Sequence, residues 1–206
     1  MGARQDPDPP PPPKPEERKG DRTRAGILAA AATRFHRDGF DGTTLADIAD
    51  DLGITRSAVL HHFASKAALL EELVRPFMEK LDEVLDATAG AGPFTVASRR
   101  RFVVDLIDFL SEHHDVAALL TRDITVHGHL PADLQLRDRA GRFLLITQEA
   151  NDLHPLAATR SLAALGTVVR PLASDDLVDF GDPATRALLV EAVLAVLKVP
   201  LPDHAA

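Results

Sequence analysis

The sequence contains no cysteine, tryptophan or tyrosine, and its only aromatic residue is phenylalanine, which occurs nine times. Without cysteine the chain can form no disulfide, and it has no thiolate to act as metal ligand or nucleophile. Its interior must be filled mainly by Leu, Ala and Val, together with the phenylalanines. Alanine and unbranched side chains lose little freedom in a helix, and no long alternating strand pattern occurs. The composition therefore predicts an all-α fold.

Long apolar runs are also missing. The N-terminus is polar and rich in proline, unlike a secretory signal peptide. The longest apolar run, Ala187–Leu197, is interrupted by Glu191 and is shorter than the ~18–20 residues that cross a bilayer. We expect a soluble, cytoplasmic, nucleoid-associated protein with no membrane partner.

Positive charge is scarce, since the net charge is −8. Its distribution is uneven: residues 1–66 carry ten basic and ten acidic side chains, whereas residues 67–206 carry 13 and 21. A neutral N-terminal third on an acidic body can bind nucleic acid only if its positive charges gather on one surface.

Three parts of the chain differ in pattern. Residues 1–18 are dominated by proline and charge, which predicts a disordered tail. Residues 19–66 contain three short helical patterns, beginning at Asp21, and residues 67–206 read as a larger helical body. Including these three, we expect about nine helices, the later ones near residues 65–89, 94–111, 115–127, 131–151, 157–173 and 183–199.

Residues 44–63 have the spacing of a helix-turn-helix. Thr44 begins a capping-box-like turn, and Thr55 can cap the next helix. Ala49, Gly53 and Val59 provide a small residue at the helix crossing, a flexible residue at the turn and an apolar residue that locks the second helix. The second helix of such a pair lies in the major groove of DNA.

The outward face of this second helix carries side chains suited to DNA. Arg56 can bind guanine or phosphate, and Ser57 can donate to phosphate or base edges. Leu60 either contacts a thymine methyl or packs beneath a neighbouring helix. Lys66 could hold a phosphate at the start of the following helix or could be a solvated charge. Arg22 and Arg24 lie early in the first helix, where the helix dipole disfavours cations unless a phosphate is close.

The segments Phe40–Ala49, Leu52–Thr55 and His61–Leu70 resemble the DNA-binding region of the tetracycline-repressor (TetR) family. The resemblance covers roughly residues 22–70, about a quarter of the chain. It implies a homodimeric regulator, usually a repressor, whose body binds a small effector. The positions that match the family's DNA contacts are Thr44, Thr55, Arg56, Ser57, His61, His62 and Lys66. One departure is Leu60, because the family usually has a tyrosine there whose hydroxyl meets a phosphate.

The C-terminal helices suggest how two copies associate. The stretch Leu188–Leu197 is apolar around nearly its whole circumference, so a face is left over after it packs on its own subunit. Residues 157–172 add small side chains that allow close helix approach. A two-fold dimer would also fit a palindromic operator with half-sites about 34 Å apart. The predicted interface residues are Ala163, Gly166, Val169, Leu189, Val193 and Val196.

An effector pocket is expected among helices 94–151, beside the helix predicted at 65–89. The candidate lining residues are Phe102, Leu106, Phe109, Leu120, Asp123, His127, Phe143 and Thr147. The low aromatic content favours an aliphatic or modest-sized ligand over a large planar one. The helix at 65–89, which contains Pro76, would link this pocket to the DNA reader, and effector binding would release the DNA.

Three other classes of function were weighed. Nine histidines allow a metal sensor, but His127 and His129 are two apart and point to different faces of a helix, and no HExxH spacing occurs. No phosphate-binding loop, nucleophile elbow or acid pair indicates an enzyme. A helix-turn-helix protein that organises DNA or binds proteins, without an effector, remains an alternative. We expect no cofactor, metal or catalytic residue.

Overall fold

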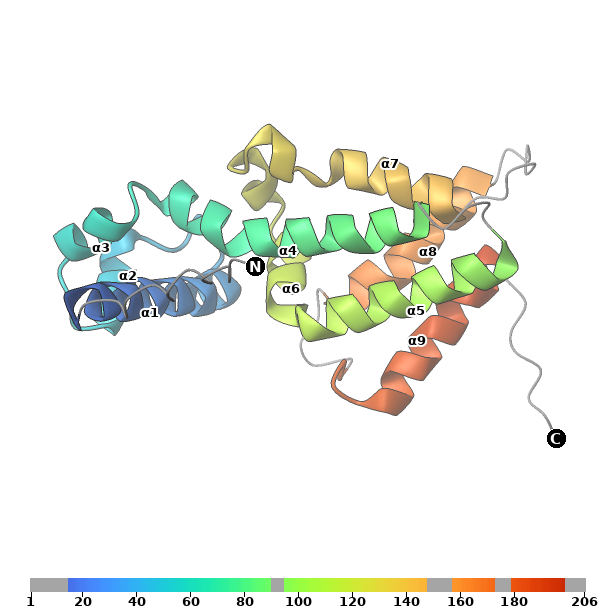
Figure 1. Cartoon of the computed structure of the whole chain (residues 1–206), viewed down its shortest axis with the longest axis horizontal. Coiled ribbons are helices and arrows are strands. Elements are labelled where there is room, and N and C mark those ends of the chain that lie inside the picture. Colours follow the sequence, from blue (N-terminus) through green and yellow to red (C-terminus); the bar gives the residue numbers. More distant parts are fainter. Residues whose placement is uncertain (1–14, 90–94, 148–156, 173–178, 199–206) are drawn as a thin grey trace, which may run out of the picture.

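In the computed structural model, residues 15–89, 95–147, 157–172 and 179–198 are described, and their regular structure is entirely helical (Figure 1). Within these ranges the chain forms nine α-helices and two short 3-10 helices. The elements are α1 (Pro15–Asp38), α2 (Leu45–Asp51), α3 (Arg56–His62), α4 (Lys66–Ala89), α5 (Val96–Glu112), α6 (His114–Arg122), η1 (Ile124–Gly128), η2 (Ala132–Leu134), α7 (Leu136–Thr147), α8 (Ala157–Leu172) and α9 (Pro183–Leu197). The all-α prediction is confirmed.

The first helix begins earlier than the sequence indicated. We expected a disordered tail to residue 18 and a helix from Asp21, but α1 starts at Pro15. Proline is tolerated in the first helical turn, where its missing N–H would have no partner. Residues 1–14 of the predicted tail lie outside the described residues. The buried face of α1 includes Ile27, Ala31 and Phe35.

Two predicted helices are divided in the structure. The helix expected at 115–127 ends at Arg122, because Asp123 adopts an extended backbone and its side chain caps the 3-10 helix that follows. The helix expected at 131–151 begins as η2 and continues as α7 only from Leu136, since Gln135 is also extended. Residues 148–151 lie outside the described part of the chain. The Asp123 carboxylate also accepts from the Phe40 amide, 83 residues away, and no local pattern indicates that contact.

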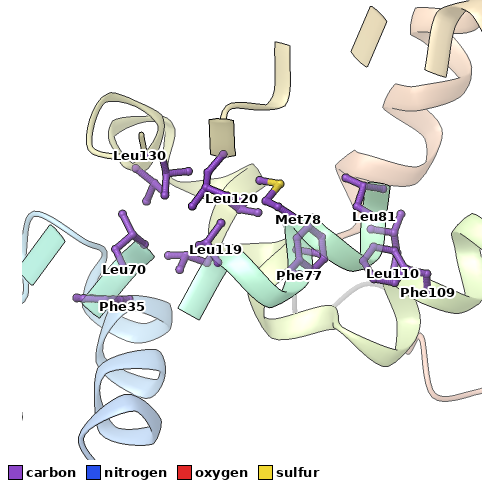
Figure 2. Close-up of a cluster of buried hydrophobic side chains, with 14 of the residues drawn as sticks. Phe35, Leu70, Phe77, Met78, Leu81, Phe109, Leu110, Leu119, Leu120 and Leu130 are labelled. Atoms are coloured by element: carbon purple, nitrogen blue, oxygen red, sulfur yellow. The ribbon is translucent and has the colours of Figure 1, made fainter. Parts of the chain in front are cut away.

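α1, α2 and α3 gather at one end of the molecule, and α4 runs from them into the body (Figure 1). α1 packs against α2, α4 and α6, while α4 also packs against α5 and α7. Figure 2 shows the resulting core, in which Phe35 and Leu70 lie beside Leu119 and Leu130. The apolar interior therefore continues from the N-terminal helices into the body.

The far side of the body is a pair of long helices. α8 packs mainly against α9, and α9 also packs against α5. Val168 and Val193 are buried where these helices meet the core. Among the described residues, none of the helices is both long and apolar enough to span a bilayer.

Candidate DNA-binding surface and body cavity

The helix-turn-helix predicted at residues 44–63 is present, with each cap in place. The Thr44 hydroxyl accepts from the Asp47 amide at 3.2 Å, and the Asp47 carboxylate accepts from the Thr44 amide at 2.8 Å. Gly53 has φ +63°, a left-handed conformation that costs a residue with a side chain about 1 kcal/mol or more. The Thr55 hydroxyl caps α3 by accepting from the Ala58 amide at 3.1 Å. These bonds fix the turn between α2 and α3.

α2 and α3 are packed together by the residues that the helix-turn-helix spacing predicted. Ala49 is 1% exposed and Val59 0%. The Ile54 amide donates to the Ala49 carbonyl at 3.0 Å, which closes the turn against α2. Phe63, which ends α3, is also buried. The buried side of α3 is thus occupied, and its opposite side faces outward.

That outward side carries the residues that were predicted to contact DNA. Arg56, Ser57 and His61 are exposed, and His62 is half-buried. Leu60 is 38% exposed, so it does not pack beneath a neighbouring helix. Among the described residues, no hydrogen bond or ion pair engages the Arg56 guanidinium. The surface therefore offers a cation, a hydroxyl and an apolar side chain together.

Lys66 has a different role from either of those considered from the sequence. Its ammonium donates to the Phe40 carbonyl at 2.6 Å and to the Thr43 carbonyl at 2.9 Å. It also lies 4.2 Å from the centre of the Phe40 ring, a cation–π distance. Lys66 therefore fixes the loop between α1 and α2 to the start of α4, and its charge is neither solvated nor turned toward an external phosphate.

The two arginines of α1 also differ from each other. Arg24 forms an ion pair with Glu72 at 2.8 Å and lies over the Phe63 ring at 4.7 Å. Its charge links α1 to α4 and to the end of α3. Arg22 is exposed, but because α1 begins at Pro15 it lies about two turns into the helix rather than in its first turn, so the dipole argument drawn from the sequence does not apply to it. Arg22 is still the better phosphate candidate of the two, because Arg24 is already paired.

α1 and α2 are joined by a paired charge. The Arg34 guanidinium donates to both carboxylate oxygens of Asp51 at 2.6 Å and also reaches Asp38. The hydrogen bonds from Arg34 hold the pKa of Asp51 below its ordinary value, since they stabilise the ionised carboxylate. Arg34 is therefore paired within the protein. Fewer basic side chains are available to bind DNA than the number of Lys and Arg residues in this part of the sequence suggests.

An apolar cavity of about 130 Å³ lies inside the body. Its wall is formed by α4, α5, α6, α7 and α8, and Figure 2 shows Phe77, Leu81, Leu110 and Leu120 in this part of the core. The complete lining is Phe77, Leu81, Leu85, Leu106, Leu110, Ala117, Leu120, Thr121, Leu136, Arg139, Ala140, Phe143, Leu165 and Val169. The pocket was expected beside α4 and the dimer pair, but no residue of α4 or α8 was predicted to line it, because apolar residues at helical spacing read as ordinary core.

Of the eight residues predicted to line a pocket, Leu106, Leu120 and Phe143 line this cavity. The others lie elsewhere. The Phe102 ring packs on the Phe143 ring, with ring centres 5.8 Å apart. The Phe109 ring packs on the Phe77 ring, with ring centres 4.9 Å apart. Thr147 is buried, and its hydroxyl donates to the Phe143 carbonyl at 2.8 Å. His127 forms a hydrogen bond with the Leu120 carbonyl at 2.9 Å.

Asp123 lies at the junction between the body and the N-terminal helices. Its carboxylate accepts from the Phe40 amide at 2.8 Å and from the Thr125 amide and hydroxyl at 3.0 and 2.5 Å. Partial burial raises the pKa of Asp123, but the hydrogen bonds from Thr125 and Phe40 outweigh it and the net pKa is lowered. His129 stacks against the Phe40 ring at 4.6 Å and its Nε2 lies 3.7 Å from Asp41. Phe40 is thus held from both sides.

The histidines do not assemble a metal site in the part of the chain that the structure describes. No group of three or more histidine or acidic side chains is placed to hold an ion there. His127 and His129, considered as a pair from the sequence, contact different partners, the Leu120 carbonyl and the Phe40 ring. These contacts account for both rings as structural groups.

α8 and α9 leave apolar side chains in contact with solvent. Leu162 is 54% exposed and Leu188 is 66% exposed, and Ala163, Ala192 and Ala195 are exposed on the same two helices. Of the predicted interface residues, Ala163 is exposed, and Gly166, Leu189 and Val196 are half-buried. Val193 is only 1% exposed and belongs to the subunit core, and Val169 lines the cavity. The prediction of Val193 as an interface residue is therefore wrong, because its side chain is not accessible to a partner, whereas the side chains of Leu162 and Leu188 are accessible.

Comparison with known proteins shows that the N-terminal region matches a protein family. The family model described as bacterial regulatory proteins, tetR family, matches residues 27–73. The HTH-type transcriptional repressor KstR2 of Mycobacterium tuberculosis is 40% identical over 71 residues, which is 32% of this chain and 36% of that protein. The HTH-type transcriptional regulator TtgR of Pseudomonas putida is 45% identical over 69 residues, 34% of this chain and 31% of that protein. The chain thus matches about a third of the length of these relatives.

The body resembles solved structures in fold rather than in sequence. The structure of KstR2 from Mycobacterium tuberculosis aligns with a TM-score of 0.68 over 85% of this chain and 93% of that one, at 18% identity. AmtR of Mycobacterium smegmatis aligns with a TM-score of 0.66 over 86% and 87%, at 21% identity. The helical arrangement is therefore shared along most of the chain. The family is one of regulators, in agreement with the expectation that the chain is not an enzyme.

Proposed function

The chain belongs to the TetR family of bacterial regulatory proteins, and we propose that it acts as a homodimeric transcriptional repressor. It would bind a palindromic operator through α3 of each subunit and leave it when a small molecule occupies the body cavity. The observation that carries the proposal is the outward face of α3. There Arg56, Ser57 and Leu60 are exposed on a helix whose opposite face is locked by Val59 and Phe63.

The chemistry of this face suits base reading in the major groove. Arg56 can donate two parallel hydrogen bonds to a guanine, and Ser57 can donate to a phosphate or a base edge. Leu60 has no hydroxyl for a phosphate, so we propose that it contacts a thymine methyl group. Arg22, His61 and His62 would add contacts to the backbone, whereas Thr44, Thr55 and Lys66 would act mainly by fixing the helices.

Two subunits are needed because a helix of seven residues reads only a few base pairs. The exposed apolar residues Leu162 and Leu188 support pairing through α8 and α9, two helices that also pack on each other. A two-fold arrangement places the two α3 helices on one face of the duplex.

The cavity is connected to the DNA reader by two elements. α4 contributes Phe77, Leu81 and Leu85 to the cavity wall and holds the α1–α2 loop through Lys66 at its other end. α6 contributes Leu120 and Thr121, and Asp123 directly after it holds the Phe40 amide. An occupant that favours a different placement of these helices would change the spacing of the two α3 helices.

The proposal is tested by selecting DNA from a random pool with the purified full chain. We expect a short palindrome, with Arg56→Ala weakening binding to it by about 1–3 kcal/mol if Arg56 reads a base. Arg137→Ala is a matched control, because Arg137 is exposed on α7, away from α3. Indifference to all sequences at low salt would contradict the proposal. Recovery of many unrelated sequences would instead favour a DNA-organising protein.

A further inference from the structure

The chemistry of the cavity wall limits what can bind there. We propose that the effector is a compact, uncharged and largely apolar molecule, aromatic or alicyclic, with a body about the size of benzene. This inference rests on the proposed function, because it treats the cavity as the effector site. All of its lining residues except Thr121 and Arg139 are apolar.

Both polar lining residues are engaged by the protein itself. The Thr121 hydroxyl donates to the Ala118 carbonyl at 3.0 Å. The Arg139 guanidinium donates to the Asp133 and Gln135 carbonyls at 3.0 Å and forms an ion pair with Asp82. Asp82 also pairs with Arg142, which in turn pairs with Asp86, so two carboxylates balance two guanidiniums along this edge of the cavity. A carboxylate or ammonium that entered the cavity would lose its hydration and would find no unpaired charge of opposite sign.

One donor beside the cavity is left over. The Arg139 Nε is buried and has no hydrogen-bond partner among the described residues. This leaves a place for a single neutral acceptor, such as a hydroxyl or carbonyl oxygen, but not for an anion, because Asp82 already neutralises the guanidinium. The ligand class therefore includes small alcohols and ketones with an apolar body.

The volume of the cavity limits the size of the apolar part of the ligand. A dry protein cavity of about 150 Å³ lined by Leu, Ile and Phe accommodates benzene. The cavity of about 130 Å³ is comparable in volume and in lining. The cavity is partly open, so this size applies to the part of a ligand that lies inside it, and α4 and α6 are among the helices of its wall.

The proposal is tested with toluene and benzoate, which share a ring and differ in charge. Thermal unfolding of the full chain is followed by far-ultraviolet circular dichroism, since the sequence has no tryptophan or tyrosine. We expect toluene to raise the Tm by about 3–6 °C at ten times its Kd. Benzoate at equal concentration should leave the Tm unchanged. An equal or larger shift with benzoate, or no shift with saturating toluene, would overturn the proposal.

Two variants separate cavity binding from surface binding. Ala140→Leu places extra carbons in the cavity and should abolish the toluene shift, while Ala97→Leu, at an exposed position of α5, should not. Thr121→Val keeps the side-chain volume, removes the hydroxyl and should retain the shift. Loss of the shift in Thr121→Val, or its persistence in Ala140→Leu, would contradict an apolar site at this place.

Operator binding measured in parallel distinguishes the ligand class from the proposed function. If toluene binds at the cavity but leaves operator affinity unchanged, the ligand class stands and effector-driven release fails. If the chain binds its operator normally while toluene does not bind, the ligand class fails and the DNA-binding function stands.

Discussion

At the scale of single residues, Phe40 connects three parts of the molecule. Its amide donates to Asp123 after α6, and its carbonyl accepts from Lys66 at the start of α4. Its ring lies between the Lys66 ammonium and the His129 imidazole. Gly39 precedes it with φ +77°, and a side chain there would approach the Asp123 carboxylate at 3.4 Å. The body and α4 thus hold the same residue of the α1–α2 loop.

The contribution of Asp123 can be measured directly. Asp123→Ala should lower the free energy of unfolding by about 1–3 kcal/mol, because the partly buried Phe40 amide loses its acceptor. Asp123→Asn keeps one acceptor oxygen and should recover part of this loss. Urea denaturation measures both. Glu79→Ala, which removes an exposed acid from α4, should change stability by less than about 0.5 kcal/mol. If Asp123→Ala behaves like this control, the junction is not held by the carboxylate.

At the scale of elements, the short helices α2 and α3 depend on their ends. Helices of seven residues are not stable alone, so caps and tertiary contacts must hold them. Thr44, Gly53 and Thr55 supply the caps and the turn, while Arg34 ties the end of α2 to α1 through Asp51. The position of α3 on the surface therefore depends on an ion pair one helix away.

This ion pair predicts a dependence on pH. The pKa of Asp51 is lowered in the folded state, so its stabilisation is present above the ordinary carboxyl pKa of about 3.9 and is lost as pH falls through the lowered value. Arg34→Met should therefore be less stable than the wild type at pH 7, and the difference should shrink below about pH 3.

Urea denaturation at both pH values measures this difference. Lys80→Met is the control, because Lys80 forms an exposed ion pair with Glu83 within α4, and this pair links no two elements. It should change stability little at either pH. A deficit of Arg34→Met that is equal at pH 7 and pH 3 would show that the ion pair with Asp51 is not its source.

At the scale of the whole molecule, the apolar core runs from α1 to α9, so the N-terminal helices are not a separate unit loosely tied to the body. Leu162 on α8 and Leu188 on α9 are exposed outside this core, and both helices belong to the part of the molecule away from α3 (Figure 1). A second copy paired through these helices would leave both α3 helices free to reach DNA.

Dimerisation through α9 is tested by Leu188→Glu. Burying a carboxylate in an apolar interface costs several kcal/mol, so dimer dissociation should increase by roughly 100-fold or more, with a parallel loss of operator affinity. Sedimentation equilibrium measures the dissociation. Leu145→Glu is the matched control, since Leu145 is 68% exposed on α7. A wild-type chain that sediments as a monomer, or equal effects of both variants, would exclude this interface.

The local features of the fold could be predicted from the sequence. The caps at Thr44, Thr55 and Ser65 and the left-handed Gly53 depend on neighbours within a few residues, and all are present. The locking of Ala49 and Val59 also follows from short-range spacing, so the helix-turn-helix and its outward residues were found without a structure.

Features made by residues distant in sequence required the tertiary structure. Lys66 and Asp123 both meet Phe40, 26 and 83 residues away, and no local pattern signals a hydrogen bond across such separations. Likewise, periodicity marks Phe77, Val169 and Val193 as apolar, but only packing decides that the first two line a cavity and that the third is core rather than interface. Backbone propensity and capping act over a few residues, whereas cavities, junctions and free surfaces depend on where whole helices come to lie.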